Sequence, residues 1–105
     1  MTTKEFFIKK IIPQIEEQIF TFEFQLVRNQ YIFERLKSEL ENLEKMPLLA
    51  GENVEKALRE RAERKAEVEK QLQEVQRNIN FLPIIIEEEK KFLEYFKTLV
   101  EKMEN

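Results

Sequence analysis

The sequence of 105 residues contains no cysteine, no histidine and no tryptophan. Without cysteine the chain can form no disulfide and offers no thiol nucleophile or thiolate ligand. Without histidine it lacks the side chain that most often acts as a general base or binds a transition metal. Ser38 is the only serine, and no imidazole is present to activate it. We therefore expect a non-enzymatic protein with no metal, no other cofactor and no small-molecule substrate.

Residues that form turns are also scarce. One glycine and three prolines leave little material for the tight connections between β-strands. All 21 acidic residues are glutamate, which is tolerated inside helices, whereas aspartate prefers caps and turns. Apolar residues make up 42 % of the chain, which is too many for a disordered protein. The composition therefore predicts an all-α protein with few connections, organised as a single helical domain over residues 1–105.

The apolar residues follow a heptad pattern in two long stretches. Alternating steps of four and three residues from Ile8 to Leu43 meet apolar side chains at every position except Asn29. The same steps run from Val54 to Met103, with polar exceptions at Arg61, Lys65 and Glu89. Each stretch is predicted to be one long helix with a narrow apolar seam. Asn29 has two interpretations: it specifies register or oligomeric state, or it fills a solvated gap.

The segment 46–53, MPLLAGEN, is the one strong break in the pattern. Pro47 is expected to end the first helix near Lys45, and Asn53 is expected to cap the second helix. Two helices joined by so short a connection usually pack antiparallel. The fold predicted is therefore a long, coiled-coil-like helical hairpin.

The two arms of this hairpin are predicted to cover about residues 3–45 and 54–103, with the tip between them. Pro13 and Pro83 each remove a backbone donor, so each is expected to kink its arm. The alternative is a compact three-helix bundle of residues 14–45, 53–80 and 83–103, in which Pro83 separates two helices.

Further apolar residues lie outside the seams. The segment 19–27, IFTFEFQLV, alternates like a β-strand, but it can equally be a helix with apolar residues on two sides. We favour the helix because the seam passes through without a change of phase. A hairpin alone would leave these side chains in water, and an apolar patch of this size usually marks an interface. The residues expected at an oligomer interface are Phe20, Phe24, Val27, Tyr31, Phe81, Ile85, Phe92, Tyr95 and Leu99.

The expected occupant of this interface is a second copy of the chain, which would give a homodimer in the form of a four-helix bundle. Two alternatives stay open: the chain folds back at its prolines and covers the patch itself, or a different protein covers it. At the tip, three apolar residues either dock a partner or close the hairpin; these are Met46, Leu48 and Leu49.

Charged residues make up 37 % of the chain, and the net charge is −3. The basic residues of the segment 58–70, LRERAERKAEVEK, alternate with glutamates, which is typical of a solvated helix with local ion pairs. The function expected is that of a cytoplasmic scaffold or adaptor that associates with itself. The alternative is a helical protein that binds nucleic acid or a membrane surface; we expect neither partner because the net charge is weakly acidic.

Overall fold

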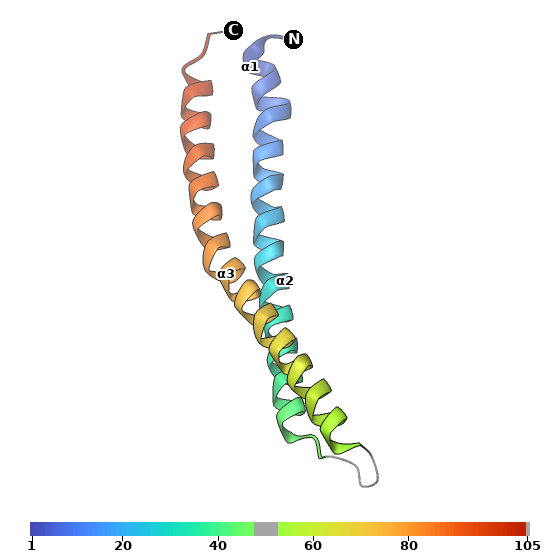
Figure 1. Ribbon diagram of the computed structural model, residues 1–105. Helices are drawn as coiled ribbons and strands as arrows, with labels where there is room; N and C mark the ends of the chain where they lie inside the picture. The colour runs from blue at the N-terminus through green and yellow to red at the C-terminus, as the bar shows by residue number, and fades with distance from the viewer. Residues whose placement is uncertain (48–52, 105) are drawn as a thin grey trace. The chain divides into compact units, whose positions relative to one another are not determined.

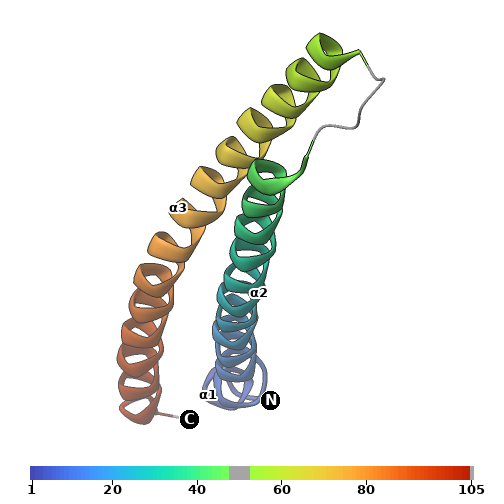
Figure 2. The same cartoon turned by 90° about the horizontal axis from the view of Figure 1, so that it is seen from below.

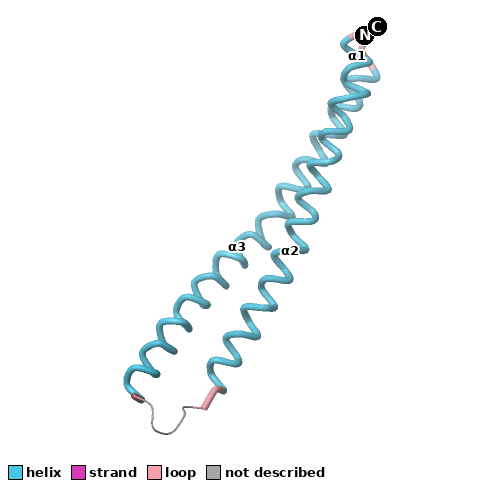
Figure 3. The backbone as a smooth tube through the Cα atoms, turned by 90° about the vertical axis from the view of Figure 1, so that its right-hand side faces the viewer, coloured by secondary structure: helices cyan, strands magenta, loops and turns pink. Residues whose placement is uncertain are grey.

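The computed structural model describes residues 1–47 and 53–104, and in these residues it contains helices and no β-strand (Figure 3). A short helix α1, Thr3–Phe6, leads into a π-helical turn, Phe7–Ile11, and then into the long helix α2, Ile12–Lys45. The second long helix is α3, Val54–Glu101. The two long helices pack against each other, which confirms the all-α helical hairpin predicted from the heptad pattern.

The helix boundaries near the tip agree with the sequence signals. Helix α2 ends at Lys45, two residues before Pro47. Asn53 caps α3, because its side-chain Oδ1 accepts a hydrogen bond of 3.1 Å from the backbone N–H of Lys56. At the other end of the chain, Thr2 caps α1 by accepting a hydrogen bond of 3.2 Å from the backbone N–H of Glu5. Each cap satisfies one backbone donor that the first turn of a helix leaves without a partner.

Pro13 is the second residue after the π-helical turn Phe7–Ile11. At the end of this turn the N–H of Ile12 donates to the carbonyl of Phe7, five residues earlier. A proline ring inside an α-helix crowds the carbonyl four residues before it, here that of Lys9. The wider π-helical turn changes the hydrogen-bond pattern at the position where this crowding arises.

Helix α3 continues through Pro83 as one element. The compact three-helix bundle required two separate helices on either side of Pro83, so that alternative is not the fold of the described residues. The heptad seam explains the continuity, because its phase is the same before and after the proline. The kinks predicted at Pro13 and Pro83 stay predictions.

The residue contacts divide the chain into two compact units. Unit 1 consists of Met1–Val27 and Asn80–Asn105, and unit 2 consists of Arg28–Ile79. In each unit a segment of α2 lies beside a segment of α3 (Figures 1 and 2). The antiparallel direction is clear within unit 2, where Asn29 contacts Asn78 and Glu39 contacts Arg64.

The core of both units is the predicted seam. The buried side chains are Ile19, Leu82, Ile86 and Val100 in unit 1, with Leu36 and Val68 in unit 2. All six occupy seam positions of the heptad pattern. Two helices can bury only a narrow strip between them, so most other seam residues are half-buried. Val68 is the only one of these side chains with no exposed surface.

Candidate interaction surfaces

The residues predicted at an oligomer interface form one row on each long helix. We call Phe20, Phe24, Val27 and Tyr31 the α2 stripe; its first three residues belong to unit 1 and Tyr31 to unit 2. We call Phe81, Ile84, Ile85, Phe92, Tyr95 and Leu99 the α3 stripe, which lies entirely in unit 1. All of these side chains except Ile85 are between 44 and 66 % exposed. Within the described residues, the chain does not fold back to cover them.

Ile84 belongs to the α3 stripe, although sequence reasoning did not assign it there. Its side chain is 58 % exposed, whereas that of Ile85 is half-buried. Successive residues advance about 100° around an α-helix, so Ile84 points farther from the seam than Ile85 does. The run of three isoleucines after Pro83 hides this difference, because a run of identical residues contains no periodic signal.

The two stripes lie on different sides of the helix pair in unit 1. Glu23 of α2 and Lys90 of α3 form an ion pair of 3.5 Å that marks one face. Phe20 lines a hollow on this face together with Glu16, Ile19, Glu23, Lys90 and Leu93. Successive residues advance about 100° around a helix, so Val27 projects on the same side of α2 as Phe20, and Phe24 lies nearly opposite the seam.

The α3 stripe flanks the seam of α3 on the side away from Lys90. At about 100° per residue, Lys90 lies on one side of the seam residues Leu82 and Ile86, whereas Phe81 and Phe92 lie on the other side. The α2 and α3 stripes of unit 1 therefore point away from each other. The eight predicted interface residues of unit 1 lie on two different sides of its helix pair, and their role at an oligomer interface stays a prediction.

Aromatic contacts support one end of the α3 stripe. The ring of Phe92 stacks on that of Phe96, with 6.0 Å between centroids and 24° between planes. Phe96 of α3 in turn contacts Phe7 of the π-helical turn, at 5.1 Å between centroids. These packed neighbours restrict the rotamer of Phe92, although its outer half stays exposed. An exposed aromatic side chain that is already held in place loses little entropy when a partner covers it.

Of the predicted tip residues, Met46 is 53 % exposed. Leu48 and Leu49 lie outside the described residues. The proposed docking role of the tip stays a prediction.

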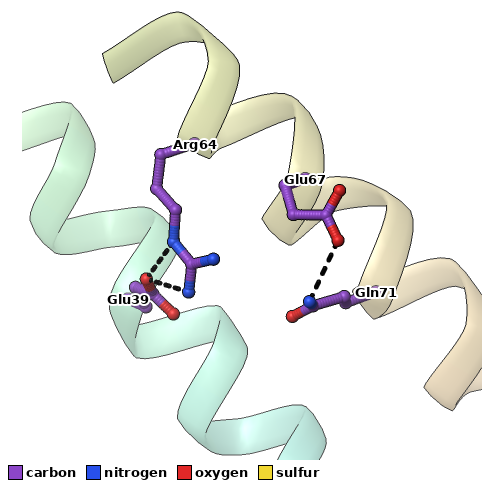
Figure 4. Close-up of polar contacts among 4 residues, drawn as sticks. All are labelled: Glu39, Arg64, Glu67 and Gln71. Atoms are coloured by element: carbon purple, nitrogen blue, oxygen red, sulfur yellow. Dashed lines mark hydrogen bonds and ion pairs between the residues drawn. The ribbon is translucent and has the colours of Figure 1, made fainter. Parts of the chain in front are cut away.

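Two basic residues of the segment 58–70, Arg64 and Lys65, pair with acids across the helices of unit 2. Arg64 contacts Glu39 through two nitrogens, with its Nη2 and Nε at 2.6 and 2.7 Å from the same carboxylate oxygen (Figure 4). Lys65 lies 3.4 Å from Glu44. On the same helix, Gln71 donates a hydrogen bond of 3.1 Å to Glu67 (Figure 4). Arg64 and Lys65 therefore do not form the unopposed basic face that nucleic-acid binding requires.

Asn29, the polar residue of the first seam, accepts a hydrogen bond of 3.1 Å from the side-chain amide of Asn78. This contact joins α2 to α3 within unit 2. Asn78 lies off the seam, so the heptad pattern gave no reason to pair the two residues. The hydrogen bond gives the side-chain oxygen of this seam asparagine a partner on the other helix.

A run of three glutamates at positions 87–89 is followed by two lysines, Lys90 and Lys91. Glu88 is 3.5 Å from Lys91, and Glu89 is half-buried on the seam. In residues 1–47 and 53–104, no group of three or more acidic side chains is arranged to hold a metal ion. Over the same residues, no helix has the length and hydropathy needed to span a bilayer.

Comparisons with models of protein families, with curated proteins and with solved structures found no match to this chain.

Proposed function

We propose that this protein is a non-enzymatic scaffold or adaptor in the cytoplasm that acts by associating with other copies of itself. The observation that carries the proposal is the pair of exposed apolar stripes in unit 1. Five of the exposed residues are large aromatic side chains, and each is 49 to 66 % exposed; they are Phe20, Phe24, Phe81, Phe92 and Tyr95. Large exposed aromatic rows are unfavourable in water and typical of interface cores.

Two properties of the chain support an interaction role over a chemical one. The hairpin core is a narrow strip, so the outer faces of the helices supply most of the surface. The chain also lacks cysteine and histidine, which removes the commonest nucleophile–base pairs. Because the stripes point in different directions, one of them stays available when the other is covered. This is the arrangement that an adaptor needs.

The experiment that tests the proposal is sedimentation equilibrium of the full-length chain over a range of concentrations up to tens of micromolar. We expect a reversible dimer or a larger closed assembly. A protein that stays monomeric over the whole range would contradict the proposal. A gel-shift assay and co-sedimentation with anionic vesicles, both at physiological salt, test the alternative of a nucleic-acid or membrane-surface binder. Saturable binding in either assay would favour that alternative.

A further inference from the structure

We infer that the α3 stripe is the surface on which a second copy of this chain docks, with the two α3 helices antiparallel about a twofold axis near residue 90. This inference rests on the proposed function, since it names the surface through which self-association occurs. A twofold interface uses the same patch on both copies, so the patch has to be complementary to itself when it is turned around.

The spacing of four of the six residues of the α3 stripe has this property. Measured from residue 90, the stripe contains Phe81 nine residues before and Leu99 nine residues after. Ile85 lies five residues before the same point, and Tyr95 lies five residues after it. In an antiparallel pair, Phe81 would therefore face Leu99 of the second copy, and Ile85 would face Tyr95. The two apolar ends of the stripe would cover each other.

The charges at the centre of the stripe are complementary in the same arrangement. Glu88 and Lys91 are the charged residues that interrupt the apolar row, and they lie on either side of residue 90. In the antiparallel pair, Glu88 of each copy lies within one residue, or about 1.5 Å along the helix, of the level of Lys91 of the other, which these long side chains can span. In the single chain these two residues form an ion pair of 3.5 Å, and both side chains are more than 60 % exposed. An exposed ion pair of this kind contributes little to stability. Replacing it with an ion pair between the two copies therefore costs little free energy.

The available area fits a weak or standard dimer. The five exposed side chains of the α3 stripe present on the order of 500 Å² of surface per copy, since a large aromatic residue alone covers 150–250 Å² when fully exposed. A typical stable interface covers roughly 800 Å² per partner. The polar rim, including Glu88 and Lys91, would supply the remainder.

The absence of cysteine allows a direct test, because any cysteine introduced is unique. The variants Phe81→Cys and Leu99→Cys are oxidised separately and as an equal mixture, and disulfide-linked dimers are counted on a non-reducing gel. In the antiparallel pair, two copies of residue 81 lie about 27 Å apart, at 1.5 Å per residue. A disulfide needs Cα atoms within about 7 Å. We expect linked dimers in the mixture and few in either variant alone.

Other results of this experiment would overturn the inference. Disulfide formation between two copies of the same variant, for both variants, would show that the two α3 helices are parallel. If two copies of Phe24→Cys formed a disulfide efficiently, and the mixture of Phe81→Cys and Leu99→Cys formed none, the interface would lie on the α2 stripe. A wild-type chain that is dimeric by sedimentation but shows no linkage in the mixture contradicts this inference alone. A monomeric wild type contradicts the proposed function as well.

Charge reversal gives a second test that leaves the apolar residues unchanged. Glu88→Lys alone places lysines opposite each other in the pair, and Lys91→Glu alone places glutamates opposite each other. We expect each variant to associate about ten-fold more weakly than wild type, because like charges at an interface repel. In the mixture, the introduced lysine of one variant would face the introduced glutamate of the other, so heterodimers should regain wild-type affinity. Absence of any recovery in the mixture would contradict the antiparallel pairing.

Discussion

Unit 1 and unit 2 are built from the same two helices and share the same kind of seam, but their outer surfaces differ. Unit 1 carries the whole α3 stripe and three of the four residues of the α2 stripe. The outer surface of unit 2 is dominated by glutamate, lysine and arginine, several of which pair across the helices. The seam therefore explains why the chain forms a hairpin, and the surface outside the seam explains where it can bind.

The two units also differ in the contacts that hold their helices together. In unit 2, ion pairs and polar contacts flank a seam that includes the fully buried Val68. In unit 1, four buried residues and a cluster of phenylalanines hold the helices together. Because exposed ion pairs contribute little to stability, we expect the apolar seam to dominate in both units.

The largest effect is expected from a charge on the seam of unit 2. Val68→Glu places a carboxylate where no side-chain surface is exposed. An uncompensated buried charge costs about 3–5 kcal/mol, which is a large part of the stability of a small domain. The variant should lose much of its helix signal by circular dichroism at 25 °C and melt at a much lower temperature.

Ala66→Glu, two residues away on an exposed position, is the matched control. It adds the same charge to the same helix without burying it, so its melting temperature should stay close to that of wild type. If both variants melted alike, the seam would not be the element that stabilises unit 2.

The next effect concerns association and not folding. Tyr95→Glu on the α3 stripe and Phe24→Glu on the α2 stripe replace aromatic residues of nearly equal exposure, 65 and 62 %. Both variants should keep the helix content of wild type. Tyr95→Glu should weaken the dimer by at least about 100-fold, because it buries a charge at the interface, whereas Phe24→Glu should leave the dimer intact. Sedimentation equilibrium of both variants at matched concentrations measures the difference. The reverse ranking would assign self-association to the α2 stripe.

The fold of each unit was predictable from the sequence because its determinants are local. The heptad steps that predicted the seam pass through Ile19, Leu36 and Val68, all of which are buried. Pro47 and Asn53 marked the helix ends, since proline and cap residues act on their immediate neighbours.

Features that depend on three dimensions were not predictable. The directions in which the two stripes point depend on which side of each seam packs against the other helix. The ion pair between Glu23 and Lys90 identifies that side. The pairing of Asn29 with Asn78 depends on the register between the helices. A heptad repeat allows that register to shift by seven residues without changing which positions form the seam. The π-helical turn Phe7–Ile11 was not predicted, because the seam continues through it without a change of phase.

A smaller effect is expected at the polar residue of the seam in unit 2. Asn29→Leu places an apolar side chain among apolar neighbours, and the amide of Asn78, which is exposed, can bond to water instead. The free energy of unfolding should stay the same or rise by up to about 1 kcal/mol, since hydrogen bonds between neutral groups contribute about that much. Urea denaturation measures the change. A loss of more than about 1 kcal/mol would instead support a role of Asn29 in fixing the register of the hairpin.

The smallest effects are expected from the ion pairs, and they compare the two units directly. Glu39→Gln removes the carboxylate that Arg64 contacts at 2.6 Å in unit 2, and Glu23→Gln removes the partner of Lys90 at 3.5 Å in unit 1. All four side chains are 37 to 51 % exposed, so each substitution should cost at most about 1 kcal/mol, with the larger cost for Glu39 because arginine makes two contacts. Both costs should shrink as salt is raised towards about 1 M, where the screening length falls to about 3 Å. Urea denaturation at low and high salt, with Arg64→Gln and Lys90→Gln to complete double-mutant cycles, measures the coupling of each pair. A coupling at Glu39–Arg64 well above about 1 kcal/mol that persists in high salt would show that charged contacts, and not the seam alone, stabilise unit 2.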